Sequence, residues 1–180
     1  SIKHTLLMTI VDAKVCNAAT ETASTKRCYI CKSTSKDFND LSKTKEVIIE
    51  ALHFGLSILH ARIRFFEFLL HLSYKINIKK WQIRSKEEKI IVQERKRAIQ
   101  VKFRNRLGLI VDVPKPGYAN SNDSNTSRRF FADTEISAEI TGVDLKLIYR
   151  FRVILEAISS GHDMDVGKFS ASPVETARLY

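Results

Sequence analysis

The stretch Phe54–Tyr74, FGLSILHARIRFFEFLLHLSY, is the clearest helical segment of the chain and decides its fold. Its apolar residues recur at steps of three and four, the spacing that lines one face of an α-helix. That face carries Leu56, Leu59, Ile63, Phe66 and Leu70. Further apolar residues widen the surface, so we expect this helix at the centre of the hydrophobic core. Charged and histidine side chains interrupt the stretch, and no run of about 18 apolar residues exists, so we expect no membrane span.

A second long helix is expected over Ser85–Leu107. Ser85 and Glu88 form a capping box at its start, and Gly108 is a natural stop after its end. Its narrow apolar stripe consists of Val92, Ile99, Phe103 and Leu107. The remaining faces are strongly basic, so this helix combines a core contact with a charged surface.

Most of the basic charge lies in this part of the chain. The net charge is +10 and the pI is about 9.6. Residues 75 to 106 include twelve Lys or Arg against three Asp or Glu. Such a concentration favours an anionic partner, either nucleic acid or an acidic membrane surface. We interpret Lys96, Arg97 and Arg104 as candidate phosphate contacts; the alternative is a solvated face of a helix that packs on the core.

Shorter elements are predicted in the N-terminal part. Thr5–Val11 is apolar and rich enough in β-branched residues to predict one buried strand. Cys16–Ser42 is polar and predicts a loop, with a short hairpin around Cys28. The hydrophobic content of 44% and the charged content of 28% are typical of a folded domain.

Helices and loops alternate in the C-terminal part. Asp112–Ser124 is expected as a loop, and Asn125 could cap a short helix that ends near Ala132. Ile136–Val143 is either a strand or an extended connector. Asp144–Ser159 predicts a third good helix, and another begins at Ser172, with a proline at its first position. The sequence therefore predicts a mainly α fold with one short N-terminal β-strand.

The cysteines and the two ends of the chain bear on its origin. Three cysteines are too few and odd in number for a secreted disulfide framework, so we expect a reducing compartment. We do not expect the first residues to form a signal peptide. Because the chain begins with Ser1 and ends about one turn into an expected helix, we interpret it as a piece of a longer protein.

Three residues are candidate metal ligands. Asp12 directly follows the predicted strand, where a carboxylate can hold a metal ion, although a turn Asp has the same position. Cys28 and Cys31 form a CxxC, whose two thiolates can bind one side of a tetrahedral zinc ion. Neither a second CxxC nor a closely spaced His pair follows. A redox role is less favoured, because no thioredoxin-like pattern surrounds the pair.

Arg128 and Arg129 are candidate anion ligands. They follow a loop rich in Asn, Ser and Asp, and they fall near the start of a short capped helix. Adjacent arginines there can clamp phosphates, and the helix N-terminus adds its own positive field. A solvated arginine pair beside the core residues Phe130 and Phe131 is an equally good interpretation.

Taken in order, these motifs resemble one protein family. The order is Leu6–Val15, then Cys28–Cys31, then Leu52–His60, then the basic helix, then Asn125–Phe130. It is similar to the central and C-terminal catalytic region of Transib-like transposases and of the related large subunit of the V(D)J recombinase. The resemblance runs over most of the chain, and the order and spacing of the motifs carry it.

The resemblance implies an RNase H-like core with three metal-binding acids, two Asp and one Glu, interrupted by a long helical zinc-binding insertion. It assigns Asp12 as the second catalytic Asp, which binds Mg²⁺ or Mn²⁺ in the intact parent protein. It assigns Cys28 and Cys31 as half of a Zn²⁺ site. Arg128 and Arg129 fall where the family has a basic pair that contacts DNA near the cleavage site.

The same resemblance implies a division of the chain and a set of partners. Residues 1–15 would be a strand of an incomplete RNase H-like core, and residues 16–180 the helical insertion. Double-stranded DNA is the expected partner, the nucleus the expected location, and a homodimer the expected state of the parent. The first acid would precede Ser1, and the Glu and both zinc histidines would follow Tyr180. We therefore expect this chain to bind DNA without cleaving it, because two-metal chemistry needs all three carboxylates.

Two other functions fit the sequence. The chain could be a non-catalytic helical module, zinc-stabilised, that binds a protein through its apolar helix faces. A weaker hypothesis is a peripheral membrane module held by its basic charge. Salt separates the first alternative from DNA binding, since contacts through apolar faces survive high salt.

Overall fold

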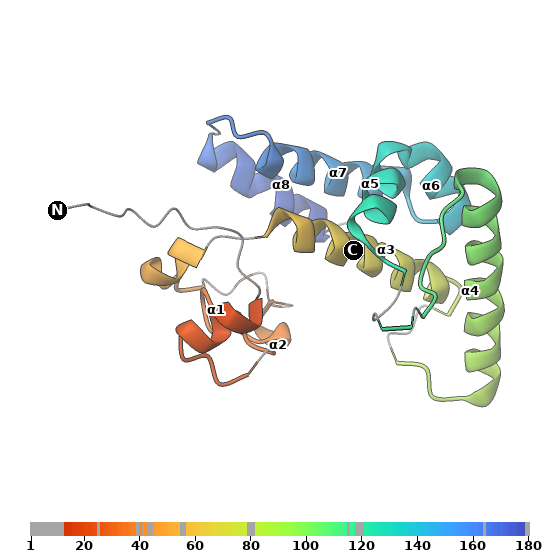
Figure 1. The fold of residues 1–180 in the computed structure, drawn as a ribbon, viewed down its shortest axis with the longest axis horizontal. Coiled ribbons are helices and arrows are strands. Elements are labelled where there is room, and N and C mark those ends of the chain that lie inside the picture. The colour runs from red at the N-terminus through yellow and green to blue at the C-terminus, as the bar shows by residue number, and fades with distance from the viewer. Residues whose placement is uncertain are drawn as a thin grey trace. The chain divides into compact units, whose positions relative to one another are not determined.

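The computed structural model describes residues 13–24, 26–38, 40, 42, 45–54, 57–78, 82–114, 116–117, 121–163 and 165–178. The chain divides into two compact units, Ser1–Ser57 and Ile58–Tyr180 (Figure 1). The predicted mainly α class is confirmed, and the described residues contain no strand. The predicted strand Thr5–Val11 lies outside them. Within the described ranges, no helix has both the length and the apolar character needed to cross a membrane.

Unit 1 consists of short elements. They are α1 (Ala13–Ala19), α2 (Ser35–Phe38) and the 3₁₀-helix η1 (Ile49–Phe54). The hairpin predicted around Cys28 is confirmed by an isolated antiparallel bridge between Arg27 and Thr34. The prediction of a loop over Cys16–Ser42 is wrong at both ends, where α1 and α2 form. In α1 the cause is local, because alanine is the best helix former and this helix contains three.

Unit 2 is a helical bundle built on α3 (Ile58–Lys75). Around it lie α4 (Lys86–Leu107), α5 (Ser124–Ala132), α6 (Thr134–Thr141) and α7 (Leu145–Ser159), and α8 (Val166–Arg178) packs against α7. The central position expected for the apolar stretch is confirmed, since α3 packs against α4, α5, α6 and α7. The helix begins four residues later than predicted, at Ile58, because η1 ends at Phe54.

Three phenylalanines join α3, α4 and α5 in the core. Phe66, Phe103 and Phe130 are fully buried. The ring centroid of Phe130 lies 5.0 Å from that of Phe66 and 5.8 Å from that of Phe103, within the range of favourable aromatic pairs. The Phe130 ring therefore packs α5 against both longer helices.

The ends of α4 agree with the sequence prediction. The Ser85 hydroxyl accepts a hydrogen bond from the Glu88 amide (3.1 Å), as the capping box requires. Gly108 ends the helix in the left-handed region, with φ of 61°, which a residue without Cβ adopts at least cost. In α5 the cap is Asp123 rather than Asn125, and the helix begins at Ser124.

Two predictions in the C-terminal part are wrong. Residues 136–143 were expected as a strand or connector, but most of them lie in α6, which Asp133 caps by accepting a hydrogen bond from the Ile136 amide (3.0 Å). No new helix begins at Ser172. Instead α8 already starts at Val166, beside the Asp165 carboxylate that accepts from the Lys168 amide (3.0 Å), and Pro173 lies inside it.

Arg95 of α4 ties together the C-terminal ends of two other helices. Its Nε donates to the Ser73 carbonyl of α3 (2.5 Å), and its Nη2 donates to the Thr141 carbonyl of α6 (2.9 Å). The last carbonyls of a helix lack partners within the helix and carry partial negative charge, so a guanidinium suits them. Gly142 lets the arginine approach, because a Cβ there would lie 3.1 Å from Nη2.

Replacing this arginine should destabilise unit 2. Arg95→Met removes both charged hydrogen bonds and keeps much of the aliphatic stem, so we expect the free energy of unfolding to fall by about 2 kcal/mol. Urea denaturation measures it. Arg97→Met is the matched control, two residues along the same helix on an exposed side chain, and should change stability by less than about 0.5 kcal/mol. Equal effects of the two substitutions would contradict this role of Arg95.

Candidate nucleic-acid interface

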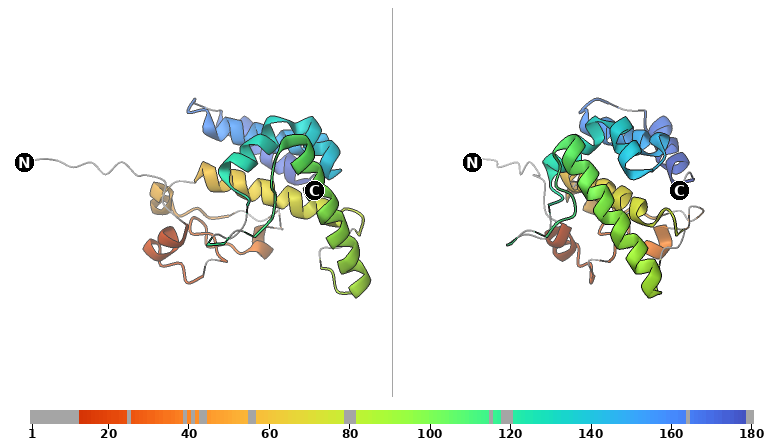
Figure 2. Two further views of the ribbon diagram at one scale, coloured as in Figure 1. Left: turned by 45° about the vertical axis from the view of Figure 1, so that its right-hand side comes forward. Right: turned by 90° about the vertical axis from the view of Figure 1, so that its right-hand side faces the viewer.

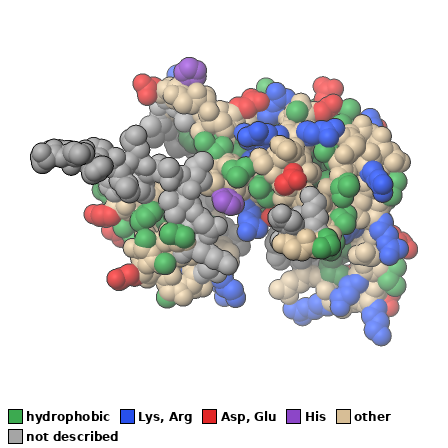
Figure 3. All heavy atoms as spheres, in the orientation of Figure 1, with side chains coloured by type: hydrophobic (Ala, Val, Ile, Leu, Met, Phe, Trp, Pro, Cys, Tyr) green, Lys and Arg blue, Asp and Glu red, His purple; other side chains and the backbone are tan. Residues whose placement is uncertain are grey.

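The cations of α4 form two groups. The inward group consists of Arg95, Lys96 and Arg106, which bind other parts of unit 2. The outward group consists of Lys86, Lys89, Arg97, Lys102 and Arg104, which are all exposed. No ion pair joins the outward cations to any part of the chain that the structure describes. In Figure 3, the Lys and Arg side chains follow the edge of unit 2 that α4 forms.

The three predicted phosphate contacts on α4 divide between these groups. Lys96 belongs to the inward group: its ammonium pairs with the Asp112 carboxylate and lies over the Tyr74 ring, 5.6 Å from the centroid. Arg97 and Arg104 belong to the outward group and lie seven residues apart, on the same face of the helix. Of the three predicted contacts, only Arg97 and Arg104 are exposed and form no ion pair with a described residue.

Arg128 and Arg129 also differ from one another. Both lie in the second turn of α5, and both are exposed. The Arg129 guanidinium donates to the Leu107 carbonyl at the C-terminal end of α4, which leaves this side chain partly committed to the fold. Arg128 has no such bond among the described residues, so it is the freer anion ligand of the pair.

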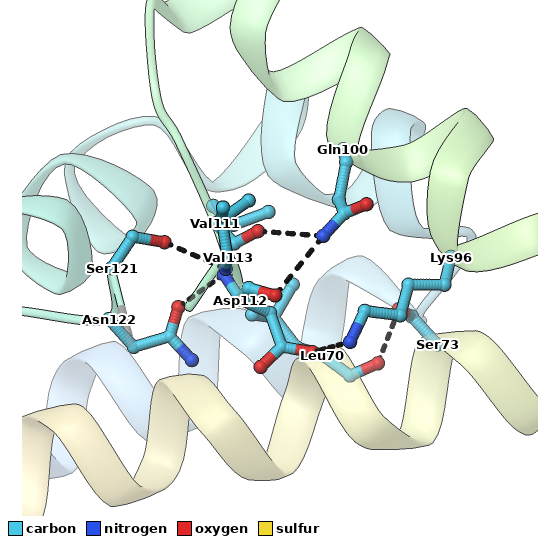
Figure 4. Close-up of polar contacts among 9 residues, drawn as sticks. All are labelled: Leu70, Ser73, Lys96, Gln100, Val111, Asp112, Val113, Ser121 and Asn122. Carbon is cyan, nitrogen blue, oxygen red and sulfur yellow. Dashed lines mark hydrogen bonds and ion pairs between the residues drawn. The ribbon is translucent and has the colours of Figure 1, made fainter. Parts of the chain in front are cut away.

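The loop between α4 and α5 is held by a polar cluster around Asp112 (Figure 4). Asp112 has a φ of 52°, in the left-handed region that a residue with a Cβ rarely adopts. Its amide donates to Asn122 Oδ1 (2.8 Å), and Gln100 Nε2 donates to the carbonyls of Val111 (3.0 Å) and Asp112 (3.2 Å). The Lys96 ammonium binds its carboxylate. These contacts place α5, and with it Arg128, relative to α4.

This cluster was missed at the sequence level. The loop itself was predicted, and its Asn and Ser residues suit turns, but nothing in the local pattern pairs Gln100 or Lys96 with residues more than ten positions away. The available signal was their position: Lys96 lies three residues before Ile99, and Gln100 directly follows it, so both are close to the predicted apolar stripe. Strained non-glycine residues held by several hydrogen bonds are often found near functional sites.

Tyr74 lies under the cluster with its hydroxyl buried. The residue is 4% exposed, and the hydroxyl has no hydrogen-bond partner among the described residues. Burial raises the pKa of Tyr74 well above its usual value of 10.0, and the negative charge of Asp112 raises it further. Tyr74 therefore supplies a ring for the Lys96 ammonium, while its hydroxyl adds an unsatisfied donor.

The CxxC of unit 1 brings two thiols together at a turn. The Cys28 amide donates to the Ser33 carbonyl (2.9 Å), and the Lys32 amide donates to the Cys28 carbonyl (2.7 Å). Burial raises the pKa of the Cys31 thiol, but hydrogen bonds from Ser33 and Cys28 and the charge of Lys45 lower it more, so the net pKa is below its usual value. A lowered thiol pKa favours the thiolate, the form that binds metals.

Of the three predicted metal ligands, the structure describes Cys28 and Cys31. Cys28 and Cys31 are free thiols of intermediate burial and suit half of a tetrahedral zinc site. No group of three or more His, Cys, Asp or Glu in the described ranges is arranged to hold a metal ion. Asp12, the candidate catalytic carboxylate, lies outside those ranges.

No protein-family model and no curated protein matches this chain.

Removal of the Tyr74 hydroxyl should stabilise the protein. In Tyr74→Phe the ring remains under Lys96 and the unsatisfied donor is gone, so we expect the free energy of unfolding at neutral pH to rise by about 1 kcal/mol. Because the folded pKa exceeds the usual value of 10.0, the contribution of Tyr74 to stability is complete below that pH and is lost as the pH rises above it.

Urea denaturation of both proteins as a function of pH measures these effects. The stability lost by the wild type above pH 10 should be smaller in Tyr74→Phe. Tyr149→Phe, at an exposed tyrosine of α7, is the control and should leave stability at neutral pH unchanged. A marked loss of stability in Tyr74→Phe would show that the hydroxyl has a partner and would refute the proposed environment.

Proposed function

We propose that this chain is a DNA-binding part of a cut-and-paste transposase, the helical insertion of an RNase H-like catalytic region. The observation that carries the proposal is the outward group of α4: five exposed Lys or Arg side chains on one helix, none of them in an ion pair with a described residue. Phosphates are the ligands that such side chains bind in a largely sequence-independent, salt-sensitive way.

The division of charge on α4 supports this proposal over a solvated face. Arg106, in contrast to the outward group, is neutralised within the fold. It binds Glu139 at 2.6 Å, and its hydrogen bond and charge lower the pKa of the Glu139 carboxyl. Arg97 and Arg104 form no ion pair with an acid in the described part of the chain. Uncompensated like charges repel one another, so a helix that keeps them exposed gains most from an anionic partner.

The motif order adds the transposase assignment. The resemblance to Transib-like transposases rests on motifs in both units, and it matches Asp12 to a catalytic carboxylate and Arg128 to a DNA contact. In such an enzyme Asp12 and two further carboxylates would hold Mg²⁺ or Mn²⁺, which would supply charge stabilisation for phosphodiester cleavage. The residues of this chain would hold the DNA through Arg97, Arg104 and Arg128. We propose that the parent acts as a homodimer in the nucleus.

Zinc binding by Cys28 and Cys31 forms part of the same proposal. Burial raises the pKa of the Cys31 thiol. Hydrogen bonds from Ser33 and Cys28 and the charge of Lys45 lower it by more, so the thiolate is favoured. A tetrahedral site needs two further ligands. Zinc would fix the turn of unit 1, as metals do in small domains with little core of their own.

A second candidate function has its own observation. Leu145, Tyr149 and Val153 recur every four residues along α7 and are 43%, 53% and 39% exposed. An exposed apolar row of this kind on a helix is typical of a protein-binding surface. In a non-catalytic interaction module this row would carry the affinity, and Arg97 and Arg104 would be dispensable.

Salt-dependent DNA binding tests the leading proposal. Fluorescence anisotropy with a labelled duplex should show affinity that falls steeply as salt rises. Lys89→Ala/Arg104→Ala removes two phosphate contacts, so the slope of log affinity against log salt should fall by about two. Lys168→Ala on α8, also exposed, is the control and should bind like the wild type. No binding at low salt, or a slope that does not respond to salt, would refute DNA binding.

The arginine pair gives a second comparison in the same assay. Arg128→Ala should weaken DNA binding without loss of stability, because its side chain is free of intramolecular bonds among the described residues. Arg129→Ala should also lower the free energy of unfolding, by about 1 kcal/mol, since the Leu107 carbonyl loses its donor. If Arg128→Ala bound DNA as the wild type does, this part of the interface would be wrong.

Cobalt substitution tests the zinc proposal. Co²⁺ bound by thiolates gives a charge-transfer absorption whose intensity grows with the number of thiolate ligands. We expect this absorption in the wild type, a weaker one in Cys31→Ser, and no change in Cys16→Ala, whose side chain is buried in α1. Absorption that persists in Cys28→Ser/Cys31→Ser would contradict the assignment.

A further inference from the structure

The outward face of α4 carries more than cations. A row of side chains at steps of three and four residues runs along the helix on the side opposite to the buried Ile99 and Phe103. It consists of Lys86, Ile90, Gln93, Arg97, Val101 and Arg104, which are all exposed. The row therefore interleaves apolar, amide and basic groups on one line.

This mixture differs from what a phosphate-binding surface requires. Contacts to phosphates need only cations and small donors. Here two apolar side chains, Ile90 and Val101, lie among the cations and are 58% and 57% exposed. Single exposed apolar residues are ordinary, but here they alternate with Gln93 and Arg97 along one helix. In the major groove, Arg and Gln pair with purine edges and apolar groups contact the thymine methyl.

Two carboxylates beside the row favour the same interpretation. Glu87 and Glu94 are exposed and border it on one side, and Glu94 lies one turn before Arg97. Carboxylates repel phosphates, which makes this border unfavourable for contact with the DNA backbone alone. They accept hydrogen bonds from the cytosine amino group in the major groove.

The N-terminal end of α4 is also free to enter a groove. The buried residues of the helix, Ile99 and Phe103, both lie in its C-terminal half. In both views of Figure 2, the N-terminal end of α4 extends beyond the other helices of its unit. A helix with its side chains is about 10–12 Å across, and the major groove of B-DNA is about 12 Å wide.

We propose that this row of α4 reads base edges in the major groove of double-stranded DNA, through Ile90, Gln93 and Arg97. This inference rests on the proposed DNA-binding function and adds sequence preference to it. Gln93 and Arg97 donate to purine acceptors, and Ile90 contacts a thymine methyl. The exposed Lys89, which lies off the row, contacts backbone phosphates only.

Selection from a library of duplexes with a randomised segment tests this inference on the full chain. We expect the wild type to enrich a short sequence and to bind it more tightly than a scrambled duplex. Arg97→Ala should reduce that ratio by about ten-fold, the effect of losing one bidentate base contact, and Gln93→Ala should reduce it in the same direction. Lys89→Ala should weaken both duplexes equally and leave the ratio unchanged. Ile90→Ala should also reduce this ratio. Ile91→Ala, at an exposed apolar residue off the row, is its control and should leave the ratio unchanged.

The outcomes separate this inference from the proposed function. Salt-sensitive binding without any enriched sequence, or a preference that Arg97→Ala and Gln93→Ala leave intact, would overturn base reading and leave DNA binding in place. No binding of any duplex at low salt would overturn both. Circular dichroism and urea denaturation of each variant verify that the fold is retained, which is expected because the substituted side chains are exposed.

Discussion

The fold of unit 2 depends on how one highly charged helix is attached to an apolar bundle. Arg95 provides the attachment by donating to carbonyls at the C-terminal ends of α3 and α6, where unpartnered carbonyls attract a cation. The Phe66–Phe103–Phe130 contacts add apolar packing a few residues further along. Because these inward contacts hold α4, its opposite face needs no partner within the bundle and remains open to solvent.

Two kinds of cation therefore share one helix. Lys96 is neutralised by Asp112 and stabilises the loop that leads to α5, whereas Arg97, the next residue, is exposed and enters no ion pair with a described residue. Neighbours in a helix point about 100° apart, so adjacent positions can serve the fold and a partner independently. The polar cluster around Asp112 links the two roles, since it fixes the distance from α4 to Arg128.

The sequence predicted what depends on local signals. The capping box at Ser85 and the stop at Gly108 were identified correctly because each is encoded within a few residues. The segment 136–143 was misread because β-branched residues there suit a strand, while the Asp133 cap and burial against α7 favour a helix. The outward placement of Arg97 followed from periodicity. The same periodicity places Lys96 on the apolar stripe, four residues after Val92 and three before Ile99. Its pairing with Asp112 could not be predicted, because Asp112 is sixteen residues away and reaches the lysine only through the turn of the loop.

Lysine reactivity measures the central claim, that α4 separates structural from DNA-binding cations, most directly. The chain is treated with an acetylating reagent with and without duplex DNA, and each site is quantified by mass spectrometry. Lys96 should react slowly in both conditions, because Asp112 and Tyr74 hold its ammonium. Lys86, Lys89 and Lys102 should react readily in free protein and become protected by DNA. Lys96 as reactive as these three, or no protection of any of them with DNA bound, would contradict the claim.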